Sequence, residues 1–276
     1  MTRRVAAVVG QPIGHSLSPA IHSAWIEAAG LDARYLALSP NDEAEFLALV
    51  NEQKTGSLIG MNVTAPYKEA ALAWARAEGA VIGETAQAAG SVNLLLLDGA
   101  PRADSTDGEG LIAALDDQAP GWRESQRPVA VLGAGGAARA AVQALIAAGT
   151  GDIRVVNRTA ERAEALARDL GPAVSGWTLA RSGEAMDGAR LLVNAATGIE
   201  PPDLSSLADG AAVMDMSYRP ILTPLLRAAG ARGLKPVDGL AMLIGQARPS
   251  FEALFGAPVP AIDVRAVALA AMGDAA

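Results

Sequence analysis

Short apolar runs alternate with amphipathic segments along most of the chain. Mostly apolar runs bounded by Gly, Pro or Asp predict strands, and these are expected over Arg4–Val9, Tyr35–Leu38, Ser57–Val63, Val92–Leu97, Val129–Leu132, Asp152–Val156, Leu191–Asn194 and Val213–Asp215. Apolar positions at helical spacing predict helices over Pro19–Ala29, from an Asn41 or Asp42 cap to about Glu52, and over Lys68–Arg76, Val81–Ala88, Gly108–Asp117, Ala137–Ala148, Thr159–Leu170, Leu240–Phe255 and Asp263–Met272. This alternation predicts an α/β fold with crossover helices on a parallel sheet.

Composition and charge narrow the class of protein. The 276 residues are 51% hydrophobic and 19% charged, which is typical of a globular protein. The 22 basic and 30 acidic residues give a net charge of −8, which argues against a nucleic-acid binder. Because cysteine is absent, disulfides, cysteine metal sites and cysteine nucleophiles are excluded. The longest run without charged residues, 5–26, contains Pro and His that a bilayer core would reject, so we expect a cytoplasmic protein with no membrane segment.

A glycine-rich turn joins the predicted strand Val129–Leu132 to the helix that follows it, and reads GAGGAA over residues 133–138. Gly133 allows a tight turn, and Gly135 lets the backbone approach a pyrophosphate. Amides at a helix N-terminus bind phosphates, so this strand–turn–helix context predicts a dinucleotide site. The alternative is a tight turn that binds no ligand. The expected cofactor-binding positions are Gly133, Ala134, Gly135, Gly136 and Ala137.

The end of the next predicted strand indicates which dinucleotide. NAD sites usually place an acidic residue there to bind the ribose hydroxyls. Here the strand ends in Asn157-Arg158-Thr159, with no acid. An arginine at this position can pair with a 2′-phosphate, so Arg158 favours NADP over NAD. The alternative is a solvated residue at the start of a helix.

Lys68 and Asp107 are the candidates for proton transfer. Lys68 lies at the expected start of a helix, where a cation opposes the helix dipole, and it is one of only three lysines. We therefore interpret it as a residue with a movable proton rather than a surface lysine. Asp107 precedes the helix expected from Gly108, so it either caps that helix or pairs with Lys68 to handle a hydroxyl proton while hydride leaves carbon.

Polar residues also follow other predicted strands. Asn62 and Thr64 alternate with Val63, so they share one face. In the loop GQPIGHSLSP (10–19), Ser18 is expected to cap the next helix. No local structural role accounts for Ser16, so it is a candidate for binding a carboxylate or a polyol. His15 is interpreted as a loop histidine, since it has no evident catalytic partner.

Taken together, these segments resemble the shikimate/quinate dehydrogenase family from about residue 8 to residue 256. The resemblance rests on ordered blocks: GQPIGHSLSP (10–19), NVTAPYK (62–68), GSVN (90–93), STDGEG (105–110), GAGGAA (133–138), NRT (157–159), DMSYRPILTP (215–224) and DGLAMLIGQA (238–247). It implies an NADP(H)-dependent, reversible reduction of 3-dehydroshikimate to shikimate, in chorismate and aromatic amino-acid biosynthesis. It also implies a small-molecule substrate, no metal, and a monomer or homodimer.

The resemblance implies two α/β domains. A substrate-binding and catalytic domain would comprise residues 1–107 and 240–276, with the last helices packed back on it, and a Rossmann-like, doubly wound NADP-binding domain would comprise residues 108–239. Lys68 and Asp107 would form the catalytic pair. Ser16 and Ser18 would hold the substrate carboxylate. Hydroxyl ligands would be Asn62, Thr64, Asn93, Asp107 and Gln246, and Tyr218 would line the substrate side. Beside the turn at 133–137, the cofactor would contact Asn157, Arg158, Thr159, Met216 and Gly239.

The chain departs from the usual family pattern in three places. Ser105 replaces an Asn beside Asp107, Leu94 replaces a Thr, and the stretch 196–200 is altered near the expected nicotinamide ribose. The Ser16-Leu-Ser18 pattern favours shikimate over quinate and leaves quinate open as a second substrate. Two other readings stay open: a related NADP-linked enzyme such as methylenetetrahydrofolate dehydrogenase, and a catalytically silent NADP-binding regulator.

Overall fold

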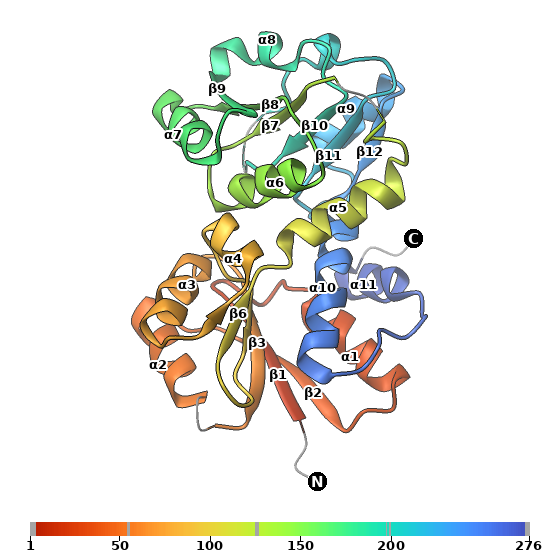
Figure 1. The fold of residues 1–276 in the computed structure, drawn as a ribbon. Coiled ribbons are helices and arrows are strands. Elements are labelled where there is room, and N and C mark those ends of the chain that lie inside the picture. The colour runs from red at the N-terminus through yellow and green to blue at the C-terminus, as the bar shows by residue number, and fades with distance from the viewer. Residues whose placement is uncertain (1–3, 54–55, 125–126, 197, 199, 274–276) are drawn as a thin grey trace. The chain divides into compact units, whose positions relative to one another are not determined.

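The computed structural model describes residues 4–53, 56–124, 127–196, 198 and 200–273. The chain separates into two compact units (Figure 1). Unit 1 comprises Met1–Thr106 and Gln246–Ala276, and unit 2 comprises Asp107–Gly245. Each unit is an α/β layer structure built on its own six-stranded sheet, so the predicted α/β fold class is confirmed.

The sheet of unit 1 is mixed. Its strand order is β2-β1-β3-β5-β6-β4. The parallel part contains β1 (Arg4–Val9), β2 (Ala33–Leu38) and β3 (Leu58–Val63). The antiparallel part adds β5 (Leu94–Leu96) and β6 (Arg102–Asp104), which form a hairpin, and β4 (Val81–Ile82) pairs with β6 in parallel.

Helices cover both faces of this sheet. One face packs on α2 (Glu43–Gln53), α3 (Lys68–Ala77) and α4 (Glu84–Ala89), through a buried cluster that includes Phe46, Met61 and Trp74. On the other face lie α1 (Ser18–Ala28), α11 (Val264–Met272) and the part of α10 (Gly239–Phe255) that belongs to unit 1 (Figure 1). Trp25 of α1 and Phe251 of α10 meet edge to face at 5.5 Å. The last helices therefore pack on the first unit, as predicted.

Unit 2 contains a fully parallel sheet of order β12-β11-β10-β7-β8-β9. Its strands are β7 (Val129–Leu132), β8 (Ile153–Asn157), β9 (Val174–Thr178), β10 (Leu191–Asn194), β11 (Ala212–Asp215) and β12 (Lys235–Val237). The chain builds outward from β7 in one direction and from β10 in the other. This is the Rossmann strand order, in which ligands bind at the carboxyl ends of the strands where the order reverses.

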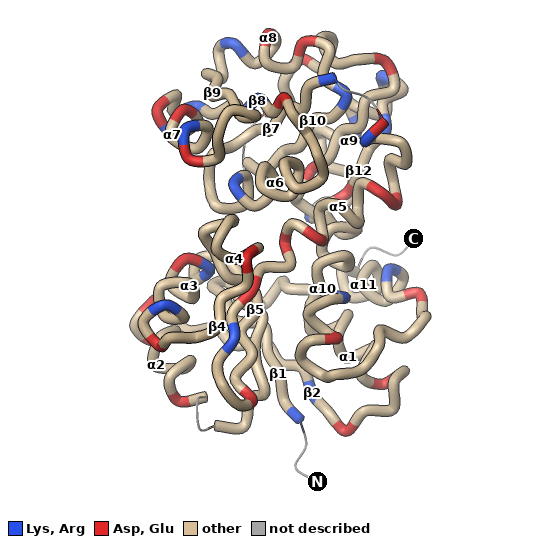
Figure 2. The backbone as a smooth tube through the Cα atoms, viewed as in Figure 1, with Lys and Arg blue, Asp and Glu red and all other residues tan. Residues whose placement is uncertain are grey.

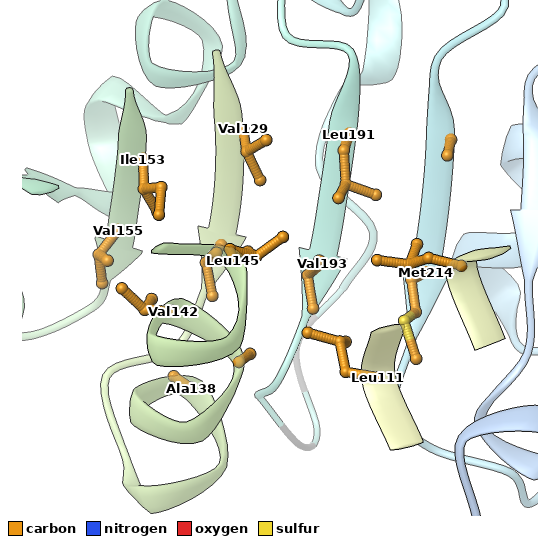
Figure 3. Packing of buried hydrophobic residues seen from close by; sticks show 14 of the residues in the cluster. Leu111, Val129, Ala138, Val142, Leu145, Ile153, Val155, Leu191, Val193 and Met214 are labelled. Carbon is orange, nitrogen blue, oxygen red and sulfur yellow. The ribbon is translucent and has the colours of Figure 1, made fainter. Parts of the chain in front are cut away.

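Alternation along these strands divides the core of unit 2 into two layers. Val129, Val131, Leu191 and Val193 face α5 (Asp107–Gln118) and α6 (Gly136–Ala147), as Figure 3 shows for the cluster around Leu145. The residues that alternate with these four in strands β7 and β10 face the opposite layer, which holds α8 (Ser182–Met186) and α9 (Pro224–Ala231). The helix α7 (Ala160–Leu170) completes the first layer. Because both faces are covered, the central strands are almost entirely apolar.

Charged residues gather on helices and loops within each unit. The central strands β7 and β10 carry none (Figure 2). Within the described residues, no helix combines the length and the apolar character that crossing a bilayer requires.

Some elements differ from the sequence predictions. The helix predicted over Val81–Ala88 is strand β4 followed by α4, because Val81 pairs with the β5–β6 hairpin through its N–H to the Pro101 carbonyl, at 3.0 Å. The strands β9 and β12 and the helices α8 and α9 were not predicted. The strands β9 and β12 are the edge strands of the unit 2 sheet and α8 is short, so each gives little periodicity.

The boundaries between the units also differ from the predicted domain limits. They fall at Thr106/Asp107 and Gly245/Gln246 rather than after residues 107 and 239. The first turns of α10 stay with unit 2, because Met242 lies in its core and a Cβ at Gly245 would come within 3.0 Å of Ala113 of α5. Helix α10 thus begins in one unit and ends in the other.

Candidate functional site

The loops that follow β1 and β3 lie side by side at one edge of the unit 1 sheet. The Thr64 amide donates to the Val9 carbonyl at 2.9 Å, and the Gln11 amide donates to the Ala65 carbonyl at 3.1 Å. A Cβ at Gly10 would collide with the Thr64 methyl group, so only glycine allows this approach. The pairing brings the loop with Ser16 close to the strand end with Thr64.

The capping role expected of Ser18 is not observed. Ser18 is the first residue of α1 rather than its cap, and the cap position is occupied by Leu17. Instead, the Ser16 hydroxyl oxygen accepts the Ser18 amide hydrogen at 3.3 Å. Proline at position 19 still lies in the first turn, as predicted. Ser18 is buried and Ser16 is half-buried. Because the Ser16 hydroxyl accepts a backbone hydrogen at the start of α1, Ser16 is the serine with the local structural role.

Asn93 and Gln246 meet beside Thr106. The Asn93 side-chain N–H groups donate to Thr106 Oγ1 at 3.0 Å and to Gln246 Oε1 at 3.2 Å. Asn93 Oδ1 accepts the Thr106 amide hydrogen at 2.9 Å. Asn93 is 2% exposed and Thr106 is 4% exposed. Asn93 and Gln246, which lie 153 positions apart in the sequence, thus bond each other directly, and Asn93 also bonds Thr106, a residue that the sequence analysis did not select.

Asn62 joins the same buried cluster. Its side-chain N–H groups donate to the Asn93 carbonyl at 3.1 Å and to Ser250 Oγ at 2.9 Å. Its Oδ1 accepts the Tyr35 hydroxyl hydrogen at 2.8 Å. Burial raises the pKa of Tyr35 well above its usual value, so the phenol keeps its proton and acts as a donor.

Lys68 begins α3, and its carbonyl accepts the Val92 amide hydrogen at 3.0 Å. That bond ties the start of α3 to the turn just before Asn93. The Lys68 side chain is half-buried. Asp107 is the first residue of α5, directly after Thr106 in the chain, and is 9% exposed. Each residue thus begins a helix, as the sequence analysis expected for Lys68.

In unit 2 the glycine-rich turn leads into α6 as predicted. Gly133 has φ +105°, a backbone conformation that residues with a side chain rarely adopt. A Cβ there would lie 3.3 Å from the backbone of Ala195, which follows β10. The turn after β7 therefore packs against the turn after β10, at the place where the strand order reverses. Gly135 precedes α6, and a Cβ there would meet no atom within 4 Å.

The end of β8 presents the predicted cationic residue. Arg158 is exposed, directly after β8. Asn157 stabilises this turn by donating to the Thr159 carbonyl at 3.0 Å, and Thr159 precedes α7. Arg139 of α6, a second candidate for binding anions, forms an ion pair with Asp169 at 3.0 Å. Arg158 is therefore the more available cation beside the turn.

Met216 and Gly239 are brought together within unit 2. A Cβ at Gly239 would lie 2.5 Å from the Met216 carbonyl oxygen and 2.6 Å from that of Ser217. This close backbone contact explains the glycine at position 239. Tyr218 follows two residues after Met216, and partial burial raises the pKa of its hydroxyl.

Asp215 organises the loops around Met216, and the sequence analysis gave it no role. Its buried carboxylate accepts hydrogens from the Asn194 side chain at 3.2 Å, the Ser217 amide at 3.0 Å and the Thr223 hydroxyl at 2.7 Å. The sequence did contain a signal for this role of Asp215: an acidic residue at the end of a buried strand, followed by a threonine directly before Pro224. For Thr106 and Ser250 no local signal existed, because their partners come from distant segments.

Two residues of the altered stretch, 197 and 199, lie outside the described residues. Among the residues that the structure does describe, no group of three His, Asp or Glu side chains is arranged to hold a metal ion.

Comparisons with known proteins identify the family. The profile of the shikimate dehydrogenase substrate binding domain matches residues 8–95, and that of shikimate / quinate 5-dehydrogenase matches residues 118–202. The shikimate dehydrogenase (NADP(+)) of Caulobacter vibrioides is 46% identical, covering 98% of this chain and 96% of that protein.

Solved structures agree with the sequence comparisons. A Thermus thermophilus shikimate 5-dehydrogenase in complex with NADP(H) and shikimate superposes with a TM-score of 0.82 at 34% identity, covering 98% of this chain and 99% of that one. A quinate dehydrogenase from Corynebacterium glutamicum in complex with NAD has a TM-score of 0.83 at 27% identity and covers 96% of each chain. The chain therefore belongs to the shikimate dehydrogenase family.

Proposed function

We propose that this protein catalyses the reversible, NADP(H)-dependent interconversion of shikimate and 3-dehydroshikimate. The near full-length identity to the Caulobacter NADP(+) enzyme carries the proposal. The buried polar cluster at the edge of unit 1 supports it, because a polyhydroxylated acid needs several hydrogen-bonding side chains in one place.

Unit 2 fits NADP. The start of α6 faces open space at Gly135, so a pyrophosphate can approach its backbone amides. The residues that would hold this group are Gly133, Ala134, Gly135, Gly136 and Ala137. Arg158, with Asn157 and Thr159, would bind the 2′-phosphate of the adenosine end. Met216 and Gly239 would lie beside the nicotinamide, and NADP, when bound, serves as the hydride donor or acceptor.

Unit 1 would supply most of the substrate contacts, and Asp107 and Tyr218 would come from unit 2. Ser16 and Ser18 would hold the substrate carboxylate, and Tyr218 would line the substrate side. Thr64, Asn93, Gln246 and Asp107 would bind its hydroxyl groups, together with Asn62. In such a site every buried polar group of the ligand must find a partner, which accounts for selectivity among polyhydroxylated acids.

Lys68 and Asp107 would transfer the proton. When the substrate alcohol is oxidised, its O–H bond breaks as hydride leaves the same carbon, and a C=O bond forms. The Lys68 amine would accept the hydroxyl proton, directly or through Asp107. In the reverse direction the Lys68 ammonium would donate a proton to the oxygen as negative charge grows there.

The test is reduction of NADP+ followed by absorbance, with shikimate and quinate offered separately and NAD+ as the second cofactor. We expect turnover with shikimate and NADP+, and a loss of about 10²–10⁴-fold in kcat for Lys68→Ala. Lys235→Ala is the matched control, since Lys235 is an exposed lysine at the start of the edge strand β12.

The outcomes separate the alternatives. Turnover confined to quinate would move the assignment to a quinate dehydrogenase. NADP binding without turnover of either acid would favour the folate-linked enzyme or the regulator. A Lys68→Ala variant with wild-type kcat would contradict the proton-transfer role.

A further inference from the structure

Ser250 occupies the centre of the buried polar cluster in unit 1. It lies on α10, one turn after Gln246, and is 0% exposed. Its hydroxyl oxygen lies 2.9 Å from Asn62 Nδ2, 3.1 Å from the Gln246 carbonyl oxygen and 3.3 Å from Thr106 Oγ1. One small side chain thus contacts β3, the turn of α10 that carries Gln246, and the segment that leads into Asp107.

The geometry allows one assignment of hydrogens around Asn62. The Asn93 backbone carbonyl can only accept, so the Asn62 atom that faces it at 3.1 Å is Nδ2. The second Nδ2 hydrogen points to Ser250, which accepts it. Asn62 Oδ1 therefore faces Tyr35 and accepts its hydroxyl hydrogen. Both amide hydrogens of Asn62 are used inside the protein.

This arrangement decides what Asn62 can offer a ligand. An amide oxygen has two lone pairs, and Tyr35 takes one of them. The remaining lone pair can accept a hydrogen, so Asn62 presents an acceptor rather than a donor. Rotation of the Asn62 amide by half a turn would place Nδ2 against Tyr35 and Oδ1 against the Asn93 carbonyl. The two hydrogen bonds that Nδ2 donates, to the Asn93 carbonyl and to Ser250, would be lost, and two oxygen atoms would face each other.

We propose that Ser250 and Tyr35 are positioning residues, which hold the Asn62 amide in the orientation that accepts a substrate hydroxyl hydrogen. Ser250 also fixes the turn of α10 that carries Gln246. The inference rests on the proposed function, in which Asn62 and Gln246 bind substrate. A fully satisfied buried network of this kind specifies one arrangement of its side chains.

The experiment compares steady-state kinetics of Ser250→Ala, Tyr35→Phe and the double variant with those of the wild type. Each single variant removes one hydrogen bond to Asn62, so we expect the KM for shikimate to rise about 5- to 10-fold, with the KM for NADP+ unchanged. Because both residues hold the same amide, the double variant should raise KM less than the product of the two single effects.

Two further proteins act as controls. Trp74→Phe removes a different hydrogen bond of unit 1, which the indole Nε1 donates to Asn51 Oδ1 at 3.0 Å. Because this bond lies away from the cluster, the variant should leave the KM for shikimate unchanged. Ser250→Thr keeps the hydroxyl group and should recover most of the affinity lost in Ser250→Ala. Tyr35→Phe keeps the ring, so it provides a folded variant if Ser250→Ala is unstable.

The possible results are distinct. A wild-type protein without shikimate turnover would overturn the proposed function. A wild-type protein that is active, with an unchanged KM for shikimate in both folded single variants, would overturn this inference alone. Equal rises in the KM values for shikimate and NADP+ would also overturn it, because they would indicate a general loss of structure.

Discussion

A buried histidine should make unit 1 sensitive to mild acid. His22 lies on α1 and is 1% exposed. Its ring stacks on Tyr35 with centroids 4.1 Å apart and an interplanar angle of 3°, and it meets the Trp25 ring edge to face at 5.7 Å. Burial lowers the pKa of His22 from its ordinary 6.5 to about 3, because the apolar surroundings disfavour the imidazolium.

The sign and size of the effect follow from proton linkage. The unfolded chain binds a proton at His22 near pH 6.5, whereas the folded chain does so only near pH 3. As the pH falls through 6.5, the unfolded state gains protons first, so the free energy of unfolding decreases. Between pH 7 and pH 5 these two pKa values predict a loss of about 2 kcal/mol from this residue.

The variant His22→Phe keeps an aromatic ring on Tyr35 and removes the titration. Unfolding in guanidinium chloride at pH 7 and pH 5 gives the free energy for both proteins. The difference between them should shift by about 2 kcal/mol in favour of the variant at pH 5, since the carboxyl groups contribute equally to both. If that difference is the same at the two pH values, the reasoning is refuted.

A second measurement reads the histidine directly. The chain has two histidines, so an NMR titration that follows the proton on Cε1 of each imidazole shows two signals. The signal missing from His22→Phe is that of His22, and it should not shift between pH 8 and pH 5. A midpoint near 6.5 for that signal would contradict the predicted burial.

Four other variants test the cofactor unit and the core. Gly133→Ala should lower the free energy of unfolding by about 1–3 kcal/mol, measured by thermal unfolding, because it forces φ +105° on alanine. Gly135→Ala should leave that free energy unchanged and weaken NADP+ binding, measured by calorimetry. NADP+ affinity equal to that of the wild type would contradict the proposed site. Arg158→Ala should raise the KM for NADP+ at least about tenfold without changing that for NAD+. Phe251→Ala, at a 0% exposed position, should cost about 3–5 kcal/mol of unfolding free energy in denaturant titrations, and a loss below 1 kcal/mol would contradict its place in the core.

Most long strands and helices of the fold were predictable from the sequence. The strands at Arg4–Val9 and Val129–Leu132 were predicted with the observed ends, because Gly10 ends the first apolar run and Pro128 and Gly133 bound the second. The short edge strand β12 was missed, since Lys235, Pro236 and Val237 show no period. Local signals for α9 were present, with Thr223 as the cap and Pro224 in the first turn, and were not used.

The positions of the candidate residues at strand ends, turns and helix starts were largely predictable from the sequence, but the contacts between them were not. The glycine turn and Arg158 occupy the predicted places because strand, turn and helix are local features. The capping role expected of Ser18 was wrong, since the helix begins one residue earlier than the pattern indicated and Ser16 receives the amide instead. The pairing of Lys68 with Asp107 stays a prediction.

By itself the sequence determined the type and order of the main elements, the glycine at the turn after β7 and the lack of any disulfide. These depend on side-chain periodicity and backbone sterics, which act over a few neighbouring residues. Only the tertiary structure decided that Asn62 bonds Ser250, 188 residues away, and that Gly239 must lack a Cβ beside Met216. Such contacts depend on how whole helices and strands pack, because a buried polar group bonds whatever partner the packing brings within reach.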